Sequence, residues 1–491
     1  MIPDERAPFA ALRGKTPEES FGCLATPCYV LDEAQLRKNG EILAGVAART
    51  GCRLLLAQKA FSNYDCYPVL APCLAGTEAS GLFEARLGWE TLPEKEVHVF
   101  CGAYRERDFD ELLRYAGHIV FNSPAQLAKF GPRAKAAGKS LGLRINPECS
   151  TQEGHAIYDP CAPGSRLGTT REQWDRQMTP ELVALLDGLH FHTLCEQDSD
   201  ALELTVEAVA DKFGDVLPRM RWLNMGGGHH VTRPGYDVER LERCIRFAQE
   251  TWGVTVYLEP GEAWALNAGF LASRVLDVTE NGGVKNAVLD CSAACHMPDV
   301  IEMPYQPPVY QAVEATGNRQ QATGDGERED DAAGTAIGRP PEAEASQDRH
   351  SEQSEESVPP PLENTDPSTS SARVAPGPQW GPADRAGELC SEAQAMPLGG
   401  LRSAQDDRSN VYRLGGPSCL SGDVIGDYRF DYPLKEGDLV LFGDLAIYST
   451  CKNNTFNGMP LPDIWRRTED GKLEKLTDFG YRDFKYRLGR P

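Results

Sequence analysis

Short apolar runs recur through the first half of the chain, and stretches with helical spacing separate them. We interpret eight of these runs as buried strands, because they are short, apolar and bounded by turn residues. They are LLLAQ (54–58), TEAS (77–80), HVF (98–100), HIVFN (118–122), LGLRIN (141–146), GLHFH (188–192), WLNMG (222–226) and VTVYLEP (254–260). Strand and helix alternating in this way predict an α/β fold, a (β/α)8 barrel of the TIM type.

The pattern changes after about residue 270, where strand-like runs follow one another without a convincing helix between them. FLASRVLDV, NAVLDCS, VYRL, DVIGDYRF and DLVLFGDLAIY are separated by Gly, Asp and Pro turns. We therefore predict a barrel over residues 33–270 and an all-β domain over residues 271–491. The early run CYVL (28–31) is assigned with residues 24–32 to the β domain, and Asp32 is the expected N-cap of the first barrel helix.

A stretch of different composition interrupts the β pattern. Residues 311–410 contain runs such as SEQSEES and VPPPLENTDPSTSSA, with 19 acidic and 8 basic residues. Low hydrophobicity, many prolines and negative charge give too little apolar surface to offset the entropy lost on ordering. We expect a disordered acidic insertion within the β domain, because the strand pattern resumes at Val411.

Charge and cysteine usage exclude several classes of protein. The formal charge of −23 over 491 residues argues against nucleic acid and anionic membrane surfaces as partners. The fifteen cysteines include no C-x-x-C pair, and His229 and His230 are adjacent, so that their side chains diverge. We therefore expect reduced thiols and no metal site. With no hydrophobic signal core and no apolar run long enough for a bilayer, a cytoplasmic location is expected.

Lys59 follows the first apolar run directly, at the position where a barrel strand ends. The active sites of (β/α)8 barrels lie at the carboxyl ends of the strands. An amine in partly apolar surroundings loses its proton more readily, and the neutral amine can form a Schiff base. For one lysine alone, a strand-end side chain that reaches solvent is the favoured explanation. Lys59 becomes a candidate catalytic residue only together with the motifs that follow.

A histidine and a glycine triplet follow two later strands. His192 ends the run GLHFH, where the period of a strand places it on the same face as His190. Its ring could stack on a planar cofactor, although a barrel histidine is more often packed in the core. Gly226, Gly227 and Gly228 follow WLNM, and a loop without Cβ atoms lets backbone N–H groups approach a phosphate. Taken alone, the triplet would equally suit a tight turn.

Two further motifs carry groups suited to acid–base chemistry. Glu259 closes the strand VTVYL, and a carboxylate there can accept a hydrogen bond from a protonated pyridine nitrogen. The loop GPSCLSGD places Cys419 and Asp423 four residues apart between glycines. A reachable thiol can donate a proton, and a carboxylate can bind a substrate ammonium. A strand-end acid and one inert thiol among fifteen are the alternatives.

Together, the lysine, the histidine, the glycine triplet, the sequence EPG and the GPSC-x3-D loop resemble the alanine racemase/ornithine decarboxylase group of pyridoxal-phosphate enzymes (fold type III). That group has a barrel followed by a β domain, which is the predicted order. Within it, the local sequences are most similar to the carboxynorspermidine (carboxyspermidine) decarboxylases. The similar stretches are ATPCYVLDEAQLRKN, GLHFHTLCEQ, LEPGEA, HMPDVIEMPY, YRLGGPSCLSGDVIGDY and TFNGMPLPDI.

The resemblance implies pyridoxal 5'-phosphate as the cofactor. Lys59 would bond to it covalently, His192 would stack on its ring, and Glu259 would pair with its ring nitrogen. The residues expected at the phosphate are Gly226, Gly227, Gly228 and Tyr448.

The resemblance also implies a homodimer with shared active sites. Cys419 and Asp423 would reach into the active site of the neighbouring subunit. There Cys419 would be a catalytic proton donor and Asp423 would bind the substrate.

The implied reaction is the decarboxylation of carboxynorspermidine or carboxyspermidine to norspermidine or spermidine, in polyamine biosynthesis. Ornithine-type decarboxylases usually continue EPG with an arginine that helps bind phosphate, whereas Glu262 stands here. This change adds negative charge, which suits a substrate with several ammonium groups. Glu262 and Asp299 (in HMPD) are therefore the candidates for binding the cationic tail, and solvated loop acids are the alternative.

Other activities stay open at this point. A diaminopimelate or ornithine/arginine decarboxylase would have the same fold, but Glu262 and HMPDVIEMPY argue against one. An alanine racemase fits less well, because the Cys-bearing loop belongs with the decarboxylases. A non-catalytic binding protein of this fold would typically have lost Lys59, His192, Glu259 and Cys419, all of which are present. Carboxynorspermidine and carboxyspermidine differ by one methylene, which a sequence does not distinguish.

Overall fold

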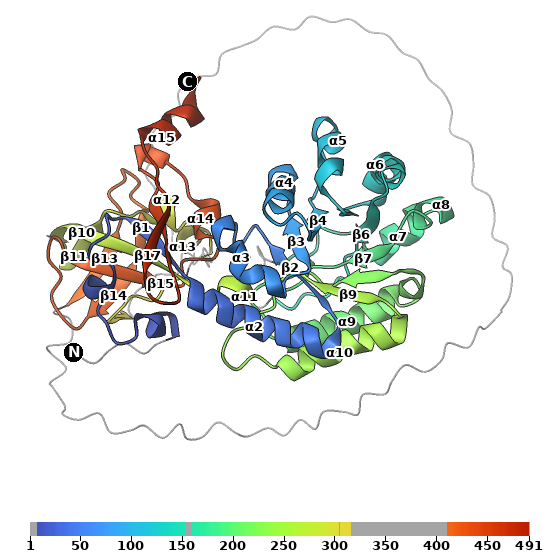
Figure 1. The fold of residues 1–491 in the computed structure, drawn as a ribbon, viewed down its shortest axis with the longest axis horizontal. Coiled ribbons are helices and arrows are strands. Elements are labelled where there is room, and N and C mark those ends of the chain that lie inside the picture. Colours follow the sequence, from blue (N-terminus) through green and yellow to red (C-terminus); the bar gives the residue numbers. More distant parts are fainter. Residues whose placement is uncertain (1–6, 153–158, 304, 316–409, 491) are drawn as a thin grey trace, which may run out of the picture. The chain divides into compact units, whose positions relative to one another are not determined.

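The first half of the chain forms a closed barrel of eight parallel strands, which confirms the predicted fold class (Figure 1). The computed structural model describes residues 7–152, 159–303, 305–315 and 410–490. Each barrel strand begins and ends within two residues of its predicted run. The strands are β2 (Arg53–Ala57), β3 (Gly76–Ala79), β4 (Glu96–Phe100), β5 (His118–Phe121), β6 (Ser140–Arg144), β7 (Gly188–His190), β8 (Trp222–Asn224) and β9 (Thr255–Leu258).

Helices follow the barrel strands, as Figure 1 shows. The first begins where predicted, because the Asp32 carboxylate caps it by accepting a hydrogen bond from the Gln35 amide. It ends at Gly51, which adopts the left-handed conformation of a helix C-cap. The helices are α2 (Glu33–Thr50), α3 (Tyr67–Leu70), α4 (Leu82–Thr91), α5 (Glu106–Tyr115), α6 (Pro124–Ala136), α7 (Arg171–Gln177), α8 (Pro180–Val183), α9 (Ser199–Phe213), α10 (Val238–Trp252) and α11 (Glu262–Ala265).

The barrel interior is filled around one large aromatic side chain. Trp222 packs there with Leu55, Val120 and Tyr257. Two neighbouring strands carry a glycine opposite the Trp222 indole. At Gly188, one of these two positions, a Cβ would lie only 2.0 Å from the indole. Side chains of the other strand face pack outward against the helices.

Replacing Gly188 by alanine is expected to lower the thermal unfolding midpoint, because the added methyl group collides with the Trp222 ring. Overpacking of this kind costs about 1–3 kcal/mol of unfolding free energy. The measurement is thermal unfolding followed by circular dichroism. Gly117→Ala is the matched control, since its Cβ would make only an ordinary 3.7 Å contact with the Val97 carbonyl. Equal midpoints for both variants would contradict the packing described here.

The second half forms a nine-stranded mixed sheet, in the order β12-β14-β13-β11-β10-β1-β16-β17, with β15 paired to β10. β1 (Cys28–Asp32) lies in this sheet, antiparallel to β10 and parallel to β16, so the early run CYVL does join the β domain. The remaining strands are β10 (Gly269–Asn281), β11 (Val284–Leu289), β12 (Ala312–Glu314), β13 (Val411–Gly415), β14 (Val424–Phe430), β15 (Leu439–Gly443), β16 (Asp463–Arg467) and β17 (Leu473–Thr477).

The β domain also carries helices that the sequence pattern did not predict. Three of them have four residues each, which is about one turn and too short for a helical period to be visible. They are α12 (Ala293–His296), α13 (Asp299–Glu302) and α14 (Ser449–Lys452). Two more flank the sheet strands in sequence, α1 (Pro17–Phe21) and α15 (Tyr481–Leu488).

The predicted insertion over residues 311–410 begins a few residues too early. Ala312, Val313 and Glu314 form β12 and pair with β14, because the strand pattern continues into the start of the polar stretch. The stretch from 316 to 409 lies outside the described residues. None of the described helices is long and apolar enough to cross a membrane.

Candidate active site

Lys59 lies just beyond the end of β2, half-buried in a turn. The turn is fixed to the next strand, because the Gln58 amide donates to the Glu78 carbonyl over 3.0 Å. The Lys59 charge acts on Glu78, His192 and Glu259, each of which comes from a different barrel strand or the loop after it. The structure thus brings three predicted residues, Lys59, His192 and Glu259, together at the carboxyl ends of the strands.

The His192 ring is held in one orientation by the glycine loop. The Gly227 amide donates to His192 Nδ1 over 2.9 Å, so a neutral ring carries its proton on Nε2. Burial, together with the charges of Lys59 and Arg144, holds the pKa of His192 well below its usual value. The ring is therefore neutral at physiological pH, which suits a flat stacking surface.

The glycine triplet passes close to two neighbouring strand ends. Gly226 and Gly228 have positive φ angles of 70° and 82°, and a Cβ on Gly227 would lie 2.4 Å from the Glu259 carbonyl. The Gly226 amide donates to Asn224 Oδ1 and the Gly227 amide to His192. The triplet therefore provides a rigid loop without side chains, and two of its three amides are already bonded within the protein.

Glu259 is a buried carboxylate that remains ionised. Its Oε1 accepts a hydrogen bond from Asn224 Nδ2 over 2.6 Å, and His190 Nε2 lies 3.4 Å from its Oε2. Burial is the largest effect and would raise the pKa of Glu259, but the bonds and charges of His190, Lys59 and Asn224 lower it below the usual value. A buried anion at this position suits a cationic N–H group.

Two polar residues at strand ends were not predicted as part of the site. Glu78 is 4% exposed, and burial beside Glu259 raises its pKa well above the usual value, which favours the neutral carboxyl. Arg144 ends β6 and donates to the His192 carbonyl over 2.9 Å. The available signal was a charged residue inside a run predicted to be a strand, Glu78 in TEAS and Arg144 in LGLRIN.

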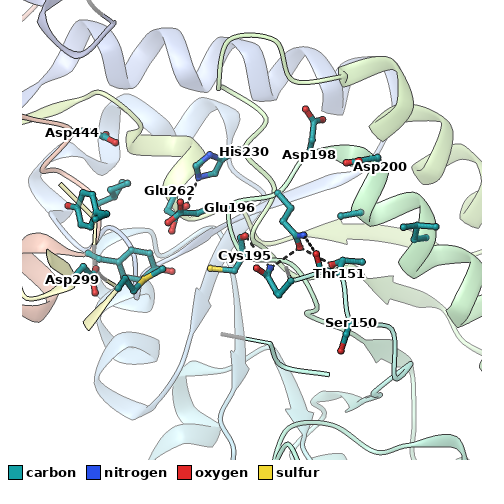
Figure 2. Close-up of a pocket in the computed structure, with 18 residues that line it drawn as sticks. Ser150, Thr151, Cys195, Glu196, Asp198, Asp200, His230, Glu262, Asp299 and Asp444 are labelled. Atoms are coloured by element: carbon teal, nitrogen blue, oxygen red, sulfur yellow. Dashed lines mark hydrogen bonds and ion pairs between the residues drawn. The ribbon is translucent and has the colours of Figure 1, made fainter. Parts of the chain in front are cut away.

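A cavity of about 870 Å³ is lined by residues that follow barrel strands and by residues of the β domain, among them Glu262, three residues past Glu259 (Figure 2). The barrel loops form part of its wall, and the segments around α13 and after β15 form another part. Among the described lining residues six carry carboxylates and none is lysine or arginine. The six acids are Glu196, Asp198, Asp200, Glu262, Asp299 and Asp444.

Burial, helped by neighbouring acids, raises the pKa of three of these carboxyls: Asp444, Glu196 and Asp299. Burial, Glu262 and Glu196 raise the pKa of Asp444 to about 7, against the opposing effect of the Asn267 amide. The pKa of Glu196 is raised by burial and by Glu262. Asp299 is ion-paired with Lys452, but burial still raises its pKa. The cavity therefore holds more negative charge than its own cations balance, and a polycationic ligand would relieve this.

Tyr448 connects the cavity with the lysine turn. It lines the cavity, and its amide donates to the Ala60 carbonyl over 2.8 Å, next to Lys59 in sequence. Burial raises the pKa of the Tyr448 phenol well above its usual value, so the phenol keeps its proton. Of the predicted site residues, Tyr448, Glu262 and Asp299 line the cavity.

Unlike Tyr448, Glu262 and Asp299, the predicted site residues Cys419 and Asp423 are not among the cavity-lining residues of the described chain. Cys419 is exposed, and its backbone amide donates a hydrogen bond to Asn457 Oδ1. Asp423 is 4% exposed, and its carboxylate accepts hydrogen bonds from the Ser292 and Ser418 hydroxyls. Within one chain, Asp423 therefore has a role in holding the Cys419 loop, which the sequence prediction did not include.

A group of potential metal ligands lies at the other end of the barrel. Glu96, His98 and His118 place their ligand atoms within 4.8 Å of one another. The two imidazoles stack with ring centroids 3.9 Å apart, and Arg53 pairs with Glu96 over 2.7 Å. Stacked, nearly parallel rings cannot both point at one ion without tilting, so we interpret the group as packing of the barrel floor.

Comparison with known proteins agrees with this arrangement. No family model matches the chain. The carboxynorspermidine/carboxyspermidine decarboxylase of Campylobacter jejuni is 34% identical over 94% of this chain and 98% of its own length. The carboxyaminopropylagmatine decarboxylase of Synechocystis is also 34% identical, over 95% of this chain and 96% of its own.

Solved structures give the same result. The crystal structure of the Campylobacter jejuni carboxynorspermidine decarboxylase complexed with norspermidine has a TM-score of 0.70 and 32% identity, covering 94% of this chain and 100% of that one. Diaminopimelate decarboxylase from Helicobacter pylori has a TM-score of 0.66 at 13% identity, covering 96% and 99%, and this likeness shows the fold alone. The chain therefore belongs to the carboxynorspermidine/carboxyspermidine decarboxylase family of carboxy-lyases.

Proposed function

We propose that this protein decarboxylates a carboxylated polyamine, carboxynorspermidine or carboxyspermidine, with pyridoxal phosphate as its cofactor. The observation that carries the proposal is the cavity with six carboxylates beside the Lys59 turn. A substrate with several ammonium groups along a chain offers one partner to each of several acids. A diaminopimelate substrate carries a second carboxylate, which these acids would repel.

The residues present fit pyridoxal phosphate. A cationic ring nitrogen suits the ionised Glu259, and the neutral His192 ring suits an aromatic face. The loop of Gly226, Gly227 and Gly228 carries no side chains, so a phosphate can approach its backbone closely. Tyr448 keeps its phenolic proton and can donate to a phosphate oxygen.

When bound, pyridoxal phosphate supplies an electron sink for the electrons left at Cα as carbon dioxide departs. Glu259 holds the proton at the ring nitrogen, which the sink requires. Glu262, Glu196 and Asp444 bind the cationic tail and fix the direction in which the carboxylate points. Lys59 provides the amine that binds the cofactor, and Cys419 returns a proton to Cα.

The role of Cys419 requires a homodimer with shared active sites. Its exposed thiol does not line the cavity of its own chain, so it would reach the cavity of a second copy. Asp423 would then act mainly by holding this loop, through Ser418. The fifteen cysteines without a paired motif and the small-molecule substrate suit a cytoplasmic enzyme.

A second substrate is favoured by one comparison. The Synechocystis relative, named for carboxyaminopropylagmatine, is as similar to this chain as the Campylobacter jejuni relative. Carboxyaminopropylagmatine ends in a guanidinium where the others carry an amine, and an acidic cavity accommodates both.

The test is steady-state kinetics of carbon dioxide release with carboxynorspermidine, carboxyspermidine, carboxyaminopropylagmatine and diaminopimelate. We expect the highest kcat/KM with carboxynorspermidine or carboxyspermidine, and none above background with diaminopimelate. A higher kcat/KM for carboxyaminopropylagmatine would replace the substrate and keep the mechanism. Turnover of diaminopimelate alone would contradict the proposal.

Glu262→Gln is expected to raise KM for carboxynorspermidine about tenfold or more, because a charge-assisted hydrogen bond contributes about 1.5–3 kcal/mol. The side chain keeps its size, so any loss comes from the charge. Asp299→Asn is the matched control, since Asp299 is already paired with Lys452 and its loss should raise KM less. A KM within twofold of the wild type for Glu262→Gln would remove Glu262 from the binding site.

A further inference from the structure

Glu262, which lines the cavity, is hydrogen-bonded to a histidine that the site prediction left out, as the dashed line in Figure 2 shows. His230 Nε2 lies 2.6 Å from Glu262 Oε2, and both side chains are about nine-tenths buried, with 9% and 10% of their surface exposed. His230 and Glu262 both line the cavity, whereas the neighbouring His229 is 2% exposed and does not. The pair therefore faces the same space as the substrate.

The backbone holds this pair in place from both sides. The His230 amide donates to the Gln197 carbonyl over 3.3 Å. Two residues later, the Thr232 hydroxyl donates to the Ala263 carbonyl over 2.8 Å, which joins the loop to the start of α11. Since Glu262 is the first residue of α11, the histidine and the glutamate keep a fixed separation.

The ring can carry a proton at physiological pH. Burial alone would lower the pKa of His230, but the hydrogen bond to Glu262 and the charges of Glu262 and Glu196 outweigh it. The pKa therefore lies above the usual 6.5, against a small opposing effect of Arg233. A protonated ring neutralises Glu262, and a neutral ring leaves its full charge to a ligand.

We propose that His230 is a positioning residue that exchanges its proton for the substrate: a substrate ammonium takes the place of the imidazolium charge beside Glu262. The inference rests on the proposed function, because it needs a polycationic ligand. When the substrate binds, one N–H proton of the imidazolium passes to bulk water, and no other covalent bond changes. The substrate ammonium then pairs with the Glu262 carboxylate, whose charge the neutral ring no longer balances. Glu262 stays in position throughout, since the neutral ring can still donate from Nε2.

Other titrating groups face the same pair. Asp444, with a pKa of about 7, and Glu196, with a raised pKa, both act electrostatically on the cavity centre, and Asp299 adds a third carboxylate. Loss of the protons of these carboxyls also favours the binding of a cation. The contributions of His230 and Asp444 to the pH dependence of binding are therefore measured with separate variants.

The first measurement counts protons released when norspermidine binds to the full-length, pyridoxal-phosphate-loaded protein. Calorimetric titrations at pH 7 in two buffers with different ionisation enthalpies give this number. His230→Gln keeps a donor for Glu262 but has no titrating proton, so we expect fewer protons released than by the wild type. His118→Gln is the matched control, because His118 is a half-buried barrel histidine at the opposite end whose pKa of about 3 keeps it neutral at pH 7. This variant should release as many protons as the wild type.

The second measurement is KM against pH between 6 and 8.5. A raised pKa means that the competing proton is present at low pH and lost as pH rises, so the wild-type KM falls with pH, by at most about tenfold per pH unit for one proton. His230→Gln should flatten this dependence, His230→Asn should do the same, and Asp444→Asn should leave the His230 part intact.

Three outcomes have distinct meanings. Fewer protons released by His230→Gln, with a flatter KM profile, supports the inference. Norspermidine binding with wild-type proton release by both His230→Gln and His230→Asn overturns it and leaves the proposed function standing. No norspermidine binding to the wild-type protein overturns both.

Discussion

Lys59→Ala is expected to reduce decarboxylation by at least about a thousandfold, because no other side chain can supply the amine that we propose binds the cofactor covalently. Lys59 stands two residues past β2, among Glu78, His192 and Glu259, where a replacement amine from solvent lacks the same orientation. The measurement is carbon dioxide release at saturating substrate, with the loss of the cofactor's visible absorbance as a second readout.

Lys38→Ala is the control for this variant. Lys38 is exposed on α2, away from the strand ends, and its loss should leave both readouts unchanged. Retention of more than about a tenth of wild-type turnover by Lys59→Ala would contradict its assignment.

Glu259→Gln is expected to lower kcat by about a hundredfold to a thousandfold, the scale seen when a preorganised charge at a reacting centre is lost. The amide retains an oxygen for Asn224 and keeps the packing of a residue only 5% exposed, but it has no negative charge for a cationic ring nitrogen. KM should change much less than kcat, because Glu259 does not line the substrate cavity.

Glu239→Gln, in the first turn of α10, tests whether any glutamate-to-glutamine change in the barrel has this effect. Its kinetics should match the wild type. A kcat for Glu259→Gln within about threefold of the wild type would show that the buried charge does not support the reaction.

The barrel was predictable because each strand is a short apolar run, and a closed parallel sheet buries every one of them. The same reasoning located Lys59, His192 and Glu259, since residues that follow parallel strands meet at one end of a barrel. Even the weak run TEAS proved to be β3, because pairing with β2 and β4 outweighs its poor apolar content. One-turn helices such as α12 are too short to show the helical period of apolar residues in the sequence.

The acidic cavity was predictable only in part. Glu262 follows a recognisable EPG, but Glu196 and Asp444 lie in loops after β7 and β15, and no local pattern predicts that these two loops line one cavity. His229 and His230 were considered only as metal ligands and set aside because adjacent side chains diverge, so the contact of His230 with Glu262 was missed. Asp423 was predicted from its spacing to Cys419, while its hydrogen bonds to serines from another segment have no sequence signature.

The most direct test of the central claim is mass spectrometry of the products formed from an equimolar mixture of carboxynorspermidine, carboxyspermidine, diaminopimelate, ornithine and arginine. The full-length protein loaded with pyridoxal phosphate is expected to form norspermidine and spermidine, with Lys59→Ala forming neither. Lysine, putrescine or agmatine as the main product would contradict the assignment of the cavity to a carboxylated polyamine.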